Sequence, residues 1–285
     1  MTAVILDGIV LGLQFGLLGV GLTVVYGIGG VLNLAYGQLA VVAAIVMSIT
    51  MRSGLATGPA VLAGISAAVA IALLLNFTIL KPVYKRDDED RVLLSLLLTI
   101  GVAFIIDGFL VWRYPIEALS LNIDWDPVSI LGVRMRAGSL LASAITLLAG
   151  GALIFFFRTT TTGKAARSVI QDEVGARLCG VNPAAVRTLI FALSGVLAGL
   201  FATTQAMTSP VPISAGFDFT ITALLVTVVG GLGSIRGAFL AGLILGVVNA
   251  MSSFYIGSYV TTIILLAAAA LTIVVRPSGL FGAKA

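Results

Sequence analysis

Residues 92–112 read VLLSLLLTIGVAFIIDGFLVW, and this run decides the fold class. It holds one charged residue, Asp107, and is bounded by Arg91 and Arg113. A helix needs about 20 consecutive apolar residues to cross the hydrocarbon core of a bilayer. The run is therefore predicted to be a membrane-spanning helix.

The rest of the chain has the same character. Of its 285 residues, 59% are hydrophobic and 10% are charged, and the mean hydropathy is +1.16. Because soluble domains have about a quarter of their residues charged, this composition excludes a soluble enzyme, a nucleic-acid binder and a large domain outside the membrane. It predicts an all-α polytopic membrane protein, one transmembrane domain over residues 1–285. About eight or nine spans are expected: 8–27, 33–51, 60–80, 92–112, 138–157, 188–207, 219–231, 237–253 and 258–275.

The sequence offers little material for catalysis. It has no histidine and one cysteine, Cys179, so a disulfide within the chain and the usual Cys/His metal sites are excluded. No pair of carboxylates lies within the spans, and neither catalytic nor metal-binding residues are expected. Cys179 itself is expected to be a small buried packing residue.

The basic residues predict the orientation. Cytoplasmic loops carry an excess of Lys and Arg, which places the loops around residues 81–91 and 158–187 inside. Alternating from these loops puts 12 of the 16 Lys and Arg residues on one side. The expected N-terminus is outside and the C-terminus inside, although the short segment 219–231 is also compatible with a re-entrant helix, which would change the count.

Two polar stretches are longer than turns. The outer one, about 113–138, has an aromatic and acidic composition typical of a membrane interface. It is either an interfacial cap or a docking surface for an external partner. Its aromatic and acidic residues are Trp112, Tyr114, Glu117, Asp124, Trp125 and Asp126.

The inner stretch, about 158–187, predicts a cytoplasmic helix. Within 165–179 the apolar positions Ala166, Ile170, Val174 and Leu178 recur every four residues, which is the pattern of an amphipathic helix. Gly180 should end it, and Asn182-Pro183 should start the next span. The helix either lies flat on the lipid surface or acts as a lever moved by a cytoplasmic partner.

Two glycine-rich breaks interrupt the spans: the first covers residues 27–38 and the second covers residues 229–237. Transporters often place broken helices along the substrate path, but small residues also allow close helix packing, so both interpretations stay open. Gly30 and Gly37 have the same spacing as Gly230 and Gly237, the pattern of an internal repeat.

Polar residues within spans are candidate pathway residues. Asp107 either pairs with Arg113 at the outer interface or faces the path, where it would bind a cationic group of the substrate. Uncharged polar residues serve either as interhelical hydrogen-bonding groups or as ligand contacts. These are Asn33, Gln38, Gln205 and Asn249.

Several motifs together resemble a known family. The run from Gly21 to Gln38, with Tyr26-Gly27 and Asn33-Leu34-Ala35-Tyr36-Gly37-Gln38, resembles the first-permease (LivH) type of the branched-chain amino acid ABC importer family. The segments 229–238 (VGGLGSIRGA) and 276–282 (RPSGLFG) are similar to its signature and its ending. Arg167, Asp172, Ala176 and Gly180-Val181-Asn182 look like its coupling segment.

The resemblance implies a permease subunit in a bacterial or archaeal inner membrane. Its implied partners are a second related permease, two cytoplasmic ATPases, an extracytoplasmic solute-binding protein and the lipid bilayer. Since this chain has no phosphate-binding loop of its own, ATP and Mg belong to the partner subunits, and no cofactor is expected here. The expected substrate-pathway residues are Tyr26, Asn33, Tyr36, Gln38, Asp107, Gly230, Gly231 and Asn249. The expected ATPase-coupling residues are Arg167, Ile170, Asp172, Val174, Ala176, Leu178, Gly180 and Asn182.

Departures from the family leave the substrate open. Tyr36-Gly37-Gln38 stands where His-Gly-Glu is common, Asn249 where Glu is common, and Asp107 where an amide is common. Branched-chain amino acids are the family default, and urea, a short amide or another amino acid are alternatives. A transporter or channel that works without ATP is the rival class. A proline at Val174 separates the two, because only an ATP-coupled importer needs the inner helix.

Overall fold

The computed structural model describes residues 1–115, 118–121, 126–130, 133–276 and 279–282. In this part of the chain, eight helices are long and apolar enough to cross a membrane, and α2 is a shorter apolar helix. The prediction of an all-α polytopic membrane protein is confirmed, and each predicted span coincides with a helix. The helices are α1 (Thr2–Gly29), α2 (Tyr36–Arg52), α3 (Thr57–Leu75), α4 (Lys81–Val83), α5 (Asp88–Arg113), α6 (Ala137–Thr159), α7 (Thr161–Gln171), α8 (Glu173–Leu178), α9 (Pro183–Thr208), α10 (Gly216–Gly230), α11 (Ile235–Tyr255) and α12 (Ser258–Val275).

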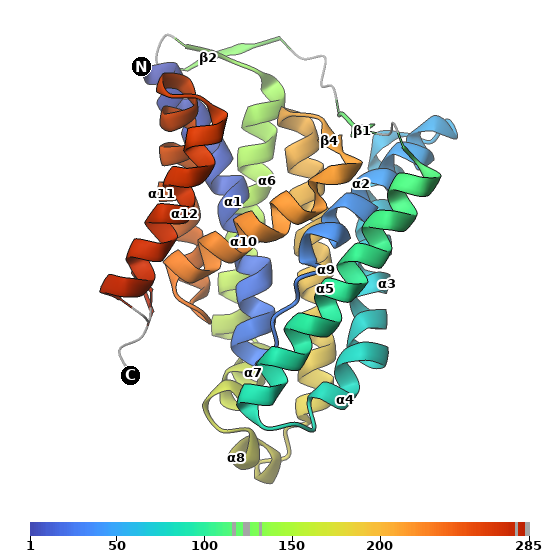
Figure 1. Cartoon of the computed structure of the whole chain (residues 1–285). Coiled ribbons are helices and arrows are strands. Elements are labelled where there is room, and N and C mark those ends of the chain that lie inside the picture. Colours follow the sequence, from blue (N-terminus) through green and yellow to red (C-terminus); the bar gives the residue numbers. More distant parts are fainter. Residues whose placement is uncertain (116–117, 122–125, 131–132, 277–278, 283–285) are drawn as a thin grey trace.

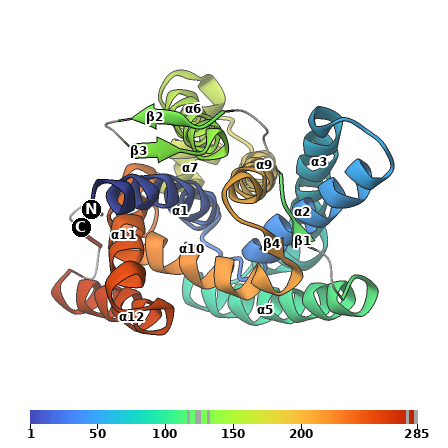
Figure 2. The ribbon, with the colours of Figure 1, turned by 90° about the horizontal axis from the view of Figure 1, so that it is seen from above.

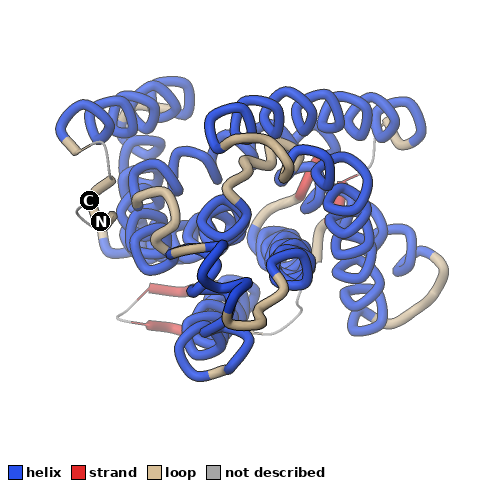
Figure 3. The backbone as a smooth tube through the Cα atoms, turned by 90° about the horizontal axis from the view of Figure 1, so that it is seen from below, coloured by secondary structure: helices blue, strands red, loops and turns tan. Residues whose placement is uncertain are grey.

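The short elements join the long helices. A π-helical turn, η1 (Asn76–Leu80), connects α3 to α4, and a 3-10 turn, η2 (Ile213–Ala215), leads into α10. Four short strands complete the described structure: β1 (Ala118–Leu119), β2 (Val128–Ile130), β3 (Val133–Met135) and β4 (Val211–Pro212). Viewed from below in Figure 3, the trace is almost entirely helix.

Helix α1 is the central element. Seen from above, it lies among α6, α9, α10 and α11 (Figure 2). Its glycines allow α11 to approach closely, since a Cβ added at Gly246 would overlap the backbone of Gly12. Small residues at a helix interface let two backbones come into contact. This glycine contact positions the start of α11 beside the end of α1.

The two ends of the molecule differ. The N-terminus and the β2–β3 hairpin lie at one end, and α7 and α8 lie at the other (Figure 1). Helix α10 runs away from the β4 end and meets α11 at the second glycine-rich break. Together with η2 it forms a segment long and apolar enough to cross a membrane, and the alternative of a re-entrant segment at 219–231 stays open.

The stretch 113–138 contains short strands as well as loop. Strands β2 and β3 form an antiparallel hairpin, and β1 pairs with β4, the strand that follows α9. The Leu121 N–H donates to the Ala206 carbonyl at 2.8 Å, and Leu119 and Leu121 are buried. The stretch is thus anchored to α9. Glu117, Asp124 and Trp125 lie outside the described residues.

The single helix predicted over 165–179 is wrong. Asp172 has an extended backbone (φ −156°, ψ 106°), so the segment divides into α7 and α8. The Asp172 side chain accepts the Val174 N–H at 2.9 Å and thereby caps α8. This capping bond favours a new helix start over continuation of α7. Cys179, expected to be buried, is exposed at the end of α8.

The expected end and restart of the segment are confirmed. Gly180 has a left-handed backbone (φ 84°), which glycine adopts without a steric penalty. Asn182 then caps α9 by accepting the N–H groups of Ala184 and Ala185, and Pro183 is the first residue of the helix. The polypeptide therefore passes directly from α8 into a long span.

Candidate functional site

The two glycine-rich breaks lie against each other. Helix α1 ends at Gly29, and Gly30 (φ 60°) donates its N–H to the Tyr26 carbonyl. Helix α10 ends at Gly230, and a tight turn leads to α11. A Cβ added at Gly27 would lie 2.9 Å from the Cα of Gly233. Both breaks thus meet at the α7–α8 end of the bundle. The sequence predicts the two interruptions but not their contact.

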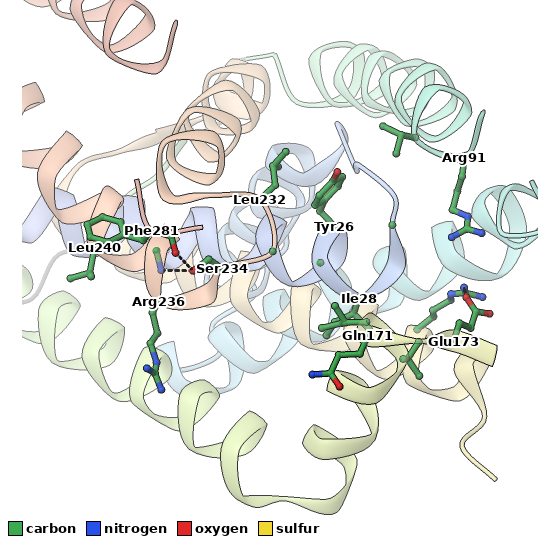
Figure 4. A pocket seen from close by; sticks show the side chains of 18 residues that line it. Tyr26, Ile28, Arg91, Gln171, Glu173, Leu232, Ser234, Arg236, Leu240 and Phe281 are labelled. Carbon is green, nitrogen blue, oxygen red and sulfur yellow. Dashed lines mark hydrogen bonds and ion pairs between the residues drawn. The ribbon is translucent and has the colours of Figure 1, made fainter. Parts of the chain in front are cut away.

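A cavity of about 1060 Å³ opens beside these breaks. Tyr26, from the last turn of α1, lies on one wall, and the α10–α11 turn forms another (Figure 4). Residues of α5, α7, α8, α9, α11 and the C-terminal segment complete the lining. Its charged residues are Arg91, Glu173, Arg187 and Arg236.

The first break turns back into the bundle. After Gly30 the chain has no regular structure over residues 31–33 and makes a turn at 34–35 before α2, and two hydroxyl groups of α5 accept backbone N–H groups of this segment. Leu32 N–H donates to Ser95 Oγ at 3.1 Å, and Leu34 N–H donates to Thr99 Oγ1 at 2.9 Å. Irregular backbone at membrane depth requires such partners, because the hydrocarbon supplies none. Ser95 and Thr99 therefore hold the break in place.

The start of α2 packs against the start of α10. Gly37 N–H donates to Thr220 Oγ1 at 3.0 Å, and a Cβ at Gly37 would overlap the Gly216 carbonyl. Asn33, Tyr36 and Gln38 are all fully buried here. Asn33 Nδ2, Tyr36 Oη and Gln38 Nε2 have no hydrogen-bond partner within the described residues. These three predicted pathway residues are buried within the helix bundle and do not line the cavity.

The remaining predicted pathway residues are dispersed. Tyr26 lines the cavity, and Gly230 and Gly231 are buried at the α10–α11 turn next to it. Asn249 is half-buried in the C-terminal half of α11, and Asp107 is half-buried in the C-terminal half of α5. The structure does not bring these last two residues to the cavity.

The pairing of Asp107 with Arg113 is not formed. The Arg113 guanidinium lies over the Tyr114 ring at 5.0 Å from its centroid. Asp107 Oδ1 is buried and has no hydrogen-bond partner among the residues that the structure describes. A carboxylate oxygen removed from water without a partner is costly, so Asp107 retains an unused capacity to bind a cation.

The predicted coupling residues divide into an inner and an outer face. Ala176 is buried against the bundle, as is Ala166 of the period-four pattern, and Asp172 caps α8. The apolar residues Ile170, Val174 and Leu178 are 47%, 68% and 85% exposed. Arg167 is also exposed, and Gly180 and Asn182 form the turn into α9. Of the period-four residues, Ala166 is buried and Ile170, Val174 and Leu178 are exposed, so the pattern does not form one continuous buried face.

An ion-pair network joins α8 to the bundle. Arg187 Nη2 donates to Glu173 Oε2 at 2.6 Å, and the same guanidinium lies 4.3 Å from the ring centroid of Tyr84. The Tyr84 hydroxyl donates in turn to Asn76 Oδ1 at 3.3 Å. Burial raises the pKa of Tyr84, so this phenol remains protonated and able to donate. Helix α8 is thereby connected to α9 and to the π-helical turn η1.

The C-terminal segment covers the second break. Leu280 N–H donates to the Val229 carbonyl at 2.9 Å, and Ser234 Oγ donates to the Phe281 carbonyl at 3.3 Å. Gly279 (φ 81°) sits directly on Gly231, where a side chain would overlap the backbone. The two sequence motifs, 229–238 and 276–282, therefore form one structural unit, within which residues 277–278 are outside the described part.

Sequence reasoning missed several residues of the site. Arg187 entered the analysis only as one of the basic residues that predict orientation, and Glu173 was not singled out. Ser95 and Thr99 carry a signal that could have been used, since they are four residues apart and hence on one face of a span. Glu173 stands four residues before Arg177, with which it pairs, but no local pattern points to its contact with Arg187, fourteen residues away across a turn.

Comparisons with known proteins agree with this architecture. Residues 4–280 match the family described as "Branched-chain amino acid transport system / permease component". The chain is 28% identical to the high-affinity branched-chain amino acid transport system permease protein LivH of Escherichia coli K12, covering 97% of this chain and 94% of that protein. It is 26% identical to BraD, a permease protein of the same description from Pseudomonas aeruginosa, over 98% and 94% of the two chains.

An archaeal relative and a solved structure extend the comparison. A probable branched-chain amino acid transport permease protein of Methanocaldococcus jannaschii is 27% identical, over 93% of this chain and 88% of the relative. PsaBC from Streptococcus pneumoniae, solved in complex with a Fab, has a TM-score of 0.52 at 15% identity. That match covers 96% of this chain and 91% of the solved chain, and it is a likeness of fold.

Proposed function

The chain belongs to the family of permease components of branched-chain amino acid transport systems, and from this we propose that it is the membrane-spanning subunit of an ATP-driven ABC importer. It moves branched-chain amino acids, or a related small polar solute, into the cell. Its membrane is the inner membrane of a bacterium or archaeon. The N-terminus lies outside and the C-terminus inside, which puts α7 and α8 in the cytoplasm.

The exposed apolar surface of α7 and α8 carries this proposal. Ile170, Val174 and Leu178 present apolar side chains, and α8 lies at the extreme end of the molecule, beyond the ends of the long helices (Figure 1). That position favours contact with a soluble partner over insertion into lipid. An exposed apolar cluster of this kind is typical of a protein interface. The partner proposed is a cytoplasmic ATPase subunit, because the chain has no nucleotide-binding loop of its own.

The contacts of α7 and α8 supply a route from the ATPase to the path. Val169, Ile170 and Gln171 of α7 line the cavity beside the two glycine-rich breaks. Glu173 joins α8 to Arg187 at the base of α9. Movement of the α7–α8 segment would therefore act both on the cavity and on a spanning helix. Such a link between a partner site and a path is what alternating access requires.

The other partners follow from the same proposal. A second related permease completes the path, and two ATPases bind the cytoplasmic side. A solute-binding protein delivers the solute to the outer face, where the stretch 113–138 is anchored to α9 through Leu121. Asp126, an exposed acidic residue of that stretch, is a candidate contact for the binding protein.

Variants of the exposed surface test the function. Val174→Asp and Leu178→Asp should abolish ATP-dependent uptake in membrane vesicles and release the ATPases when the tagged chain is purified. The chain should still be inserted normally, because both side chains are exposed in the folded protein. Lys164→Asp is the matched control. Like the two test variants it adds an acidic residue at an exposed position, here in α7 rather than α8, and it should leave uptake intact.

Two results would overturn the proposal. One is uptake by the chain alone in vesicles without ATP, which would indicate a secondary transporter or a channel. The other is unchanged uptake in the Val174→Asp and Leu178→Asp variants. Mass spectrometry of the proteins that copurify with the wild type identifies the ATPases and the second permease directly.

A further inference from the structure

A second cavity, of about 300 Å³, lies at the α7–α8 end between α1, α6, α7 and the start of α11. Three of its lining residues are arginines, one from each of three elements: Arg158 of α6, Arg167 of α7 and Arg236 of α11. No acidic residue lines it. In Figure 4 the Arg236 side chain extends from the start of α11 toward the ribbons of α6 and α7.

All three arginines are exposed and are therefore accessible to a ligand. Within the part of the chain that the structure describes, none of them makes an ion pair or a side-chain hydrogen bond. The carboxylate nearest in sequence to Arg167, Asp172, is used to cap α8, and Glu173 pairs with Arg177 and Arg187. Three guanidinium groups around one cavity repel one another unless an anion neutralises them.

The backbone adds to the positive potential. Ser234, Ile235 and Arg236 are the N-cap and the first two residues of α11, and all three line the cavity. Ser234 Oγ accepts the Gly237 N–H at 3.1 Å, but the first-turn N–H groups of a helix have no acceptor within the helix. The positive end of a helix of this length favours an anion.

The apolar part of the lining indicates where the anion comes from. Ile154 and Phe157 belong to the last turns of α6, a spanning helix, and Val24 belongs to α1. A phospholipid carries both a phosphate group and acyl chains. The phosphate group would suit the arginines of this cavity, and the start of an acyl chain would suit its apolar wall. Basic pockets between spanning helices at the cytoplasmic side bind anionic headgroups.

We propose that this cavity is a binding site for an anionic phospholipid, in which Arg158, Arg167 and Arg236 hold the phosphate group. Guanidinium groups suit this role because their planar donor set matches phosphate oxygens in pairs. The bound lipid would lie against α1 just before the first glycine-rich break, since Thr23, Val24, Gly27 and Ile28 also line the cavity. The site is independent of which solute is carried.

Native mass spectrometry of the purified chain tests the proposal. The chain is exchanged into nanodiscs of phosphatidylglycerol or of phosphatidylcholine with the same acyl chains, and released lipid adducts are counted. The wild type should retain phosphatidylglycerol but not phosphatidylcholine. The double variant Arg158→Gln/Arg236→Gln should bind phosphatidylglycerol roughly ten- to thirty-fold more weakly. Each basic residue near an anionic headgroup strengthens its binding about three- to six-fold.

The control removes the same charge from the same end of the molecule. Arg86→Gln/Lys164→Gln changes two exposed basic residues that do not line the cavity. It should retain phosphatidylglycerol as the wild type does, whereas an equal loss in this variant would overturn the proposal. Thermal unfolding of both double variants checks that each is folded.

Two further measurements complete the test. Inorganic phosphate added to the nanodiscs should not displace the lipid, and displacement would identify a site for free phosphate instead. The assembled transporter should also keep the lipid. Its loss on assembly would show that another subunit covers the arginines, and would overturn the lipid site.

Discussion

Arg187 joins Glu173 of α8 to the body of the bundle through a hydrogen-bonded ion pair of 2.6 Å. The Arg187 side chain is 7% exposed, and its guanidinium lies over the ring of Tyr84. Glu173 also pairs with Arg177, whose side chain is 62% exposed. One carboxylate thus has two arginine partners, one buried and one at the surface.

These two partners are predicted to differ strongly in importance. Arg187→Ala should reduce ATP-dependent uptake about 10-fold or more, because it removes the buried contact between α8 and α9 and leaves the Tyr84 ring without its cation. Arg177→Ala should change uptake less than about 3-fold, since exposed ion pairs contribute about 0–1 kcal/mol. ATP hydrolysis and uptake are measured together, so that uncoupling is distinguished from loss of assembly.

Arg187→Lys gives a sharper comparison. Lysine keeps the charge but lacks the planar group that stacks on Tyr84 while binding Glu173. Uptake should lie between that of the wild type and that of Arg187→Ala. Equal uptake in the Ala variants at positions 177 and 187 would contradict the proposed route from α8 to α9.

The hydroxyl of Thr99 is predicted to be needed for the first break. Thr99→Val keeps the shape of the side chain but removes the acceptor of the Leu34 N–H, which leaves a backbone donor without a partner at a cost of about 1–3 kcal/mol. The melting temperature of the purified chain should fall by about 5 °C. Thr99→Ser should restore it.

Thr78→Val is the control for Thr99→Val. The Thr78 hydroxyl, in the π-helical turn η1, is exposed and donates to the Leu74 carbonyl four residues earlier, at the end of α3. Its loss should leave the melting temperature within about 1 °C of the wild type. A similar fall in both variants would mean that the first glycine-rich break, between α1 and α2, does not depend on Thr99.

Two glycines in spanning helices are predicted to respond to alanine in opposite directions. At Gly246 a new Cβ would overlap the backbone of Gly12, so Gly246→Ala should force α1 and α11 apart and lower stability by about 1–3 kcal/mol. At Gly151 of α6 a Cβ would meet nothing within 4 Å. Gly151→Ala should therefore stabilise its helix by up to about 1 kcal/mol. Thermal unfolding of both purified variants measures the difference.

The spans could be predicted from the sequence because their signal is local. A run such as 92–112 contains its own evidence, and the polar breaks on either side of it mark its ends. The capping of α9 by Asn182 and the end of α8 at Gly180 were predictable for the same reason. Each depends on the residue types of two or three neighbouring positions.

The site could not be predicted in this way, because its contacts join distant parts of the chain. The meeting of Gly27 with Gly233 depends on how α1 packs against α11. The division of the segment 158–187 at Asp172 was missed because the pattern of one apolar residue every four positions continues across it. There the capping bond to Val174 outweighs the helical pattern. The internal repeat indicated by the glycine spacing stays a prediction: the first break separates its two helices by residues 30–35, whereas the second separates its helices by residues 231–234.

Asp107 is predicted to determine which solutes are carried. Its Oδ1 atom, in the C-terminal half of α5, is buried and has no hydrogen-bond partner within the described residues, and Arg113, the cation expected beside it, lies over Tyr114 instead. A substrate ammonium group would supply the missing positive charge. Asp107→Asn should therefore raise the apparent KM for an amino acid about 10- to 100-fold, the value of a hydrogen bond to a charged group.

The same variant should transport uncharged solutes unchanged. Uptake of urea or a short amide, if the wild type carries either, does not involve an ammonium group and gives the internal control. Asp7→Asn, at an exposed carboxylate near the start of α1, controls for the loss of a negative charge on the outer side. If Asp107→Asn left the apparent KM for amino acids unchanged, Asp107 would have no part in substrate binding. Its buried oxygen would then be expected to contact the second permease, which crosslinking from a cysteine at position 107 would detect.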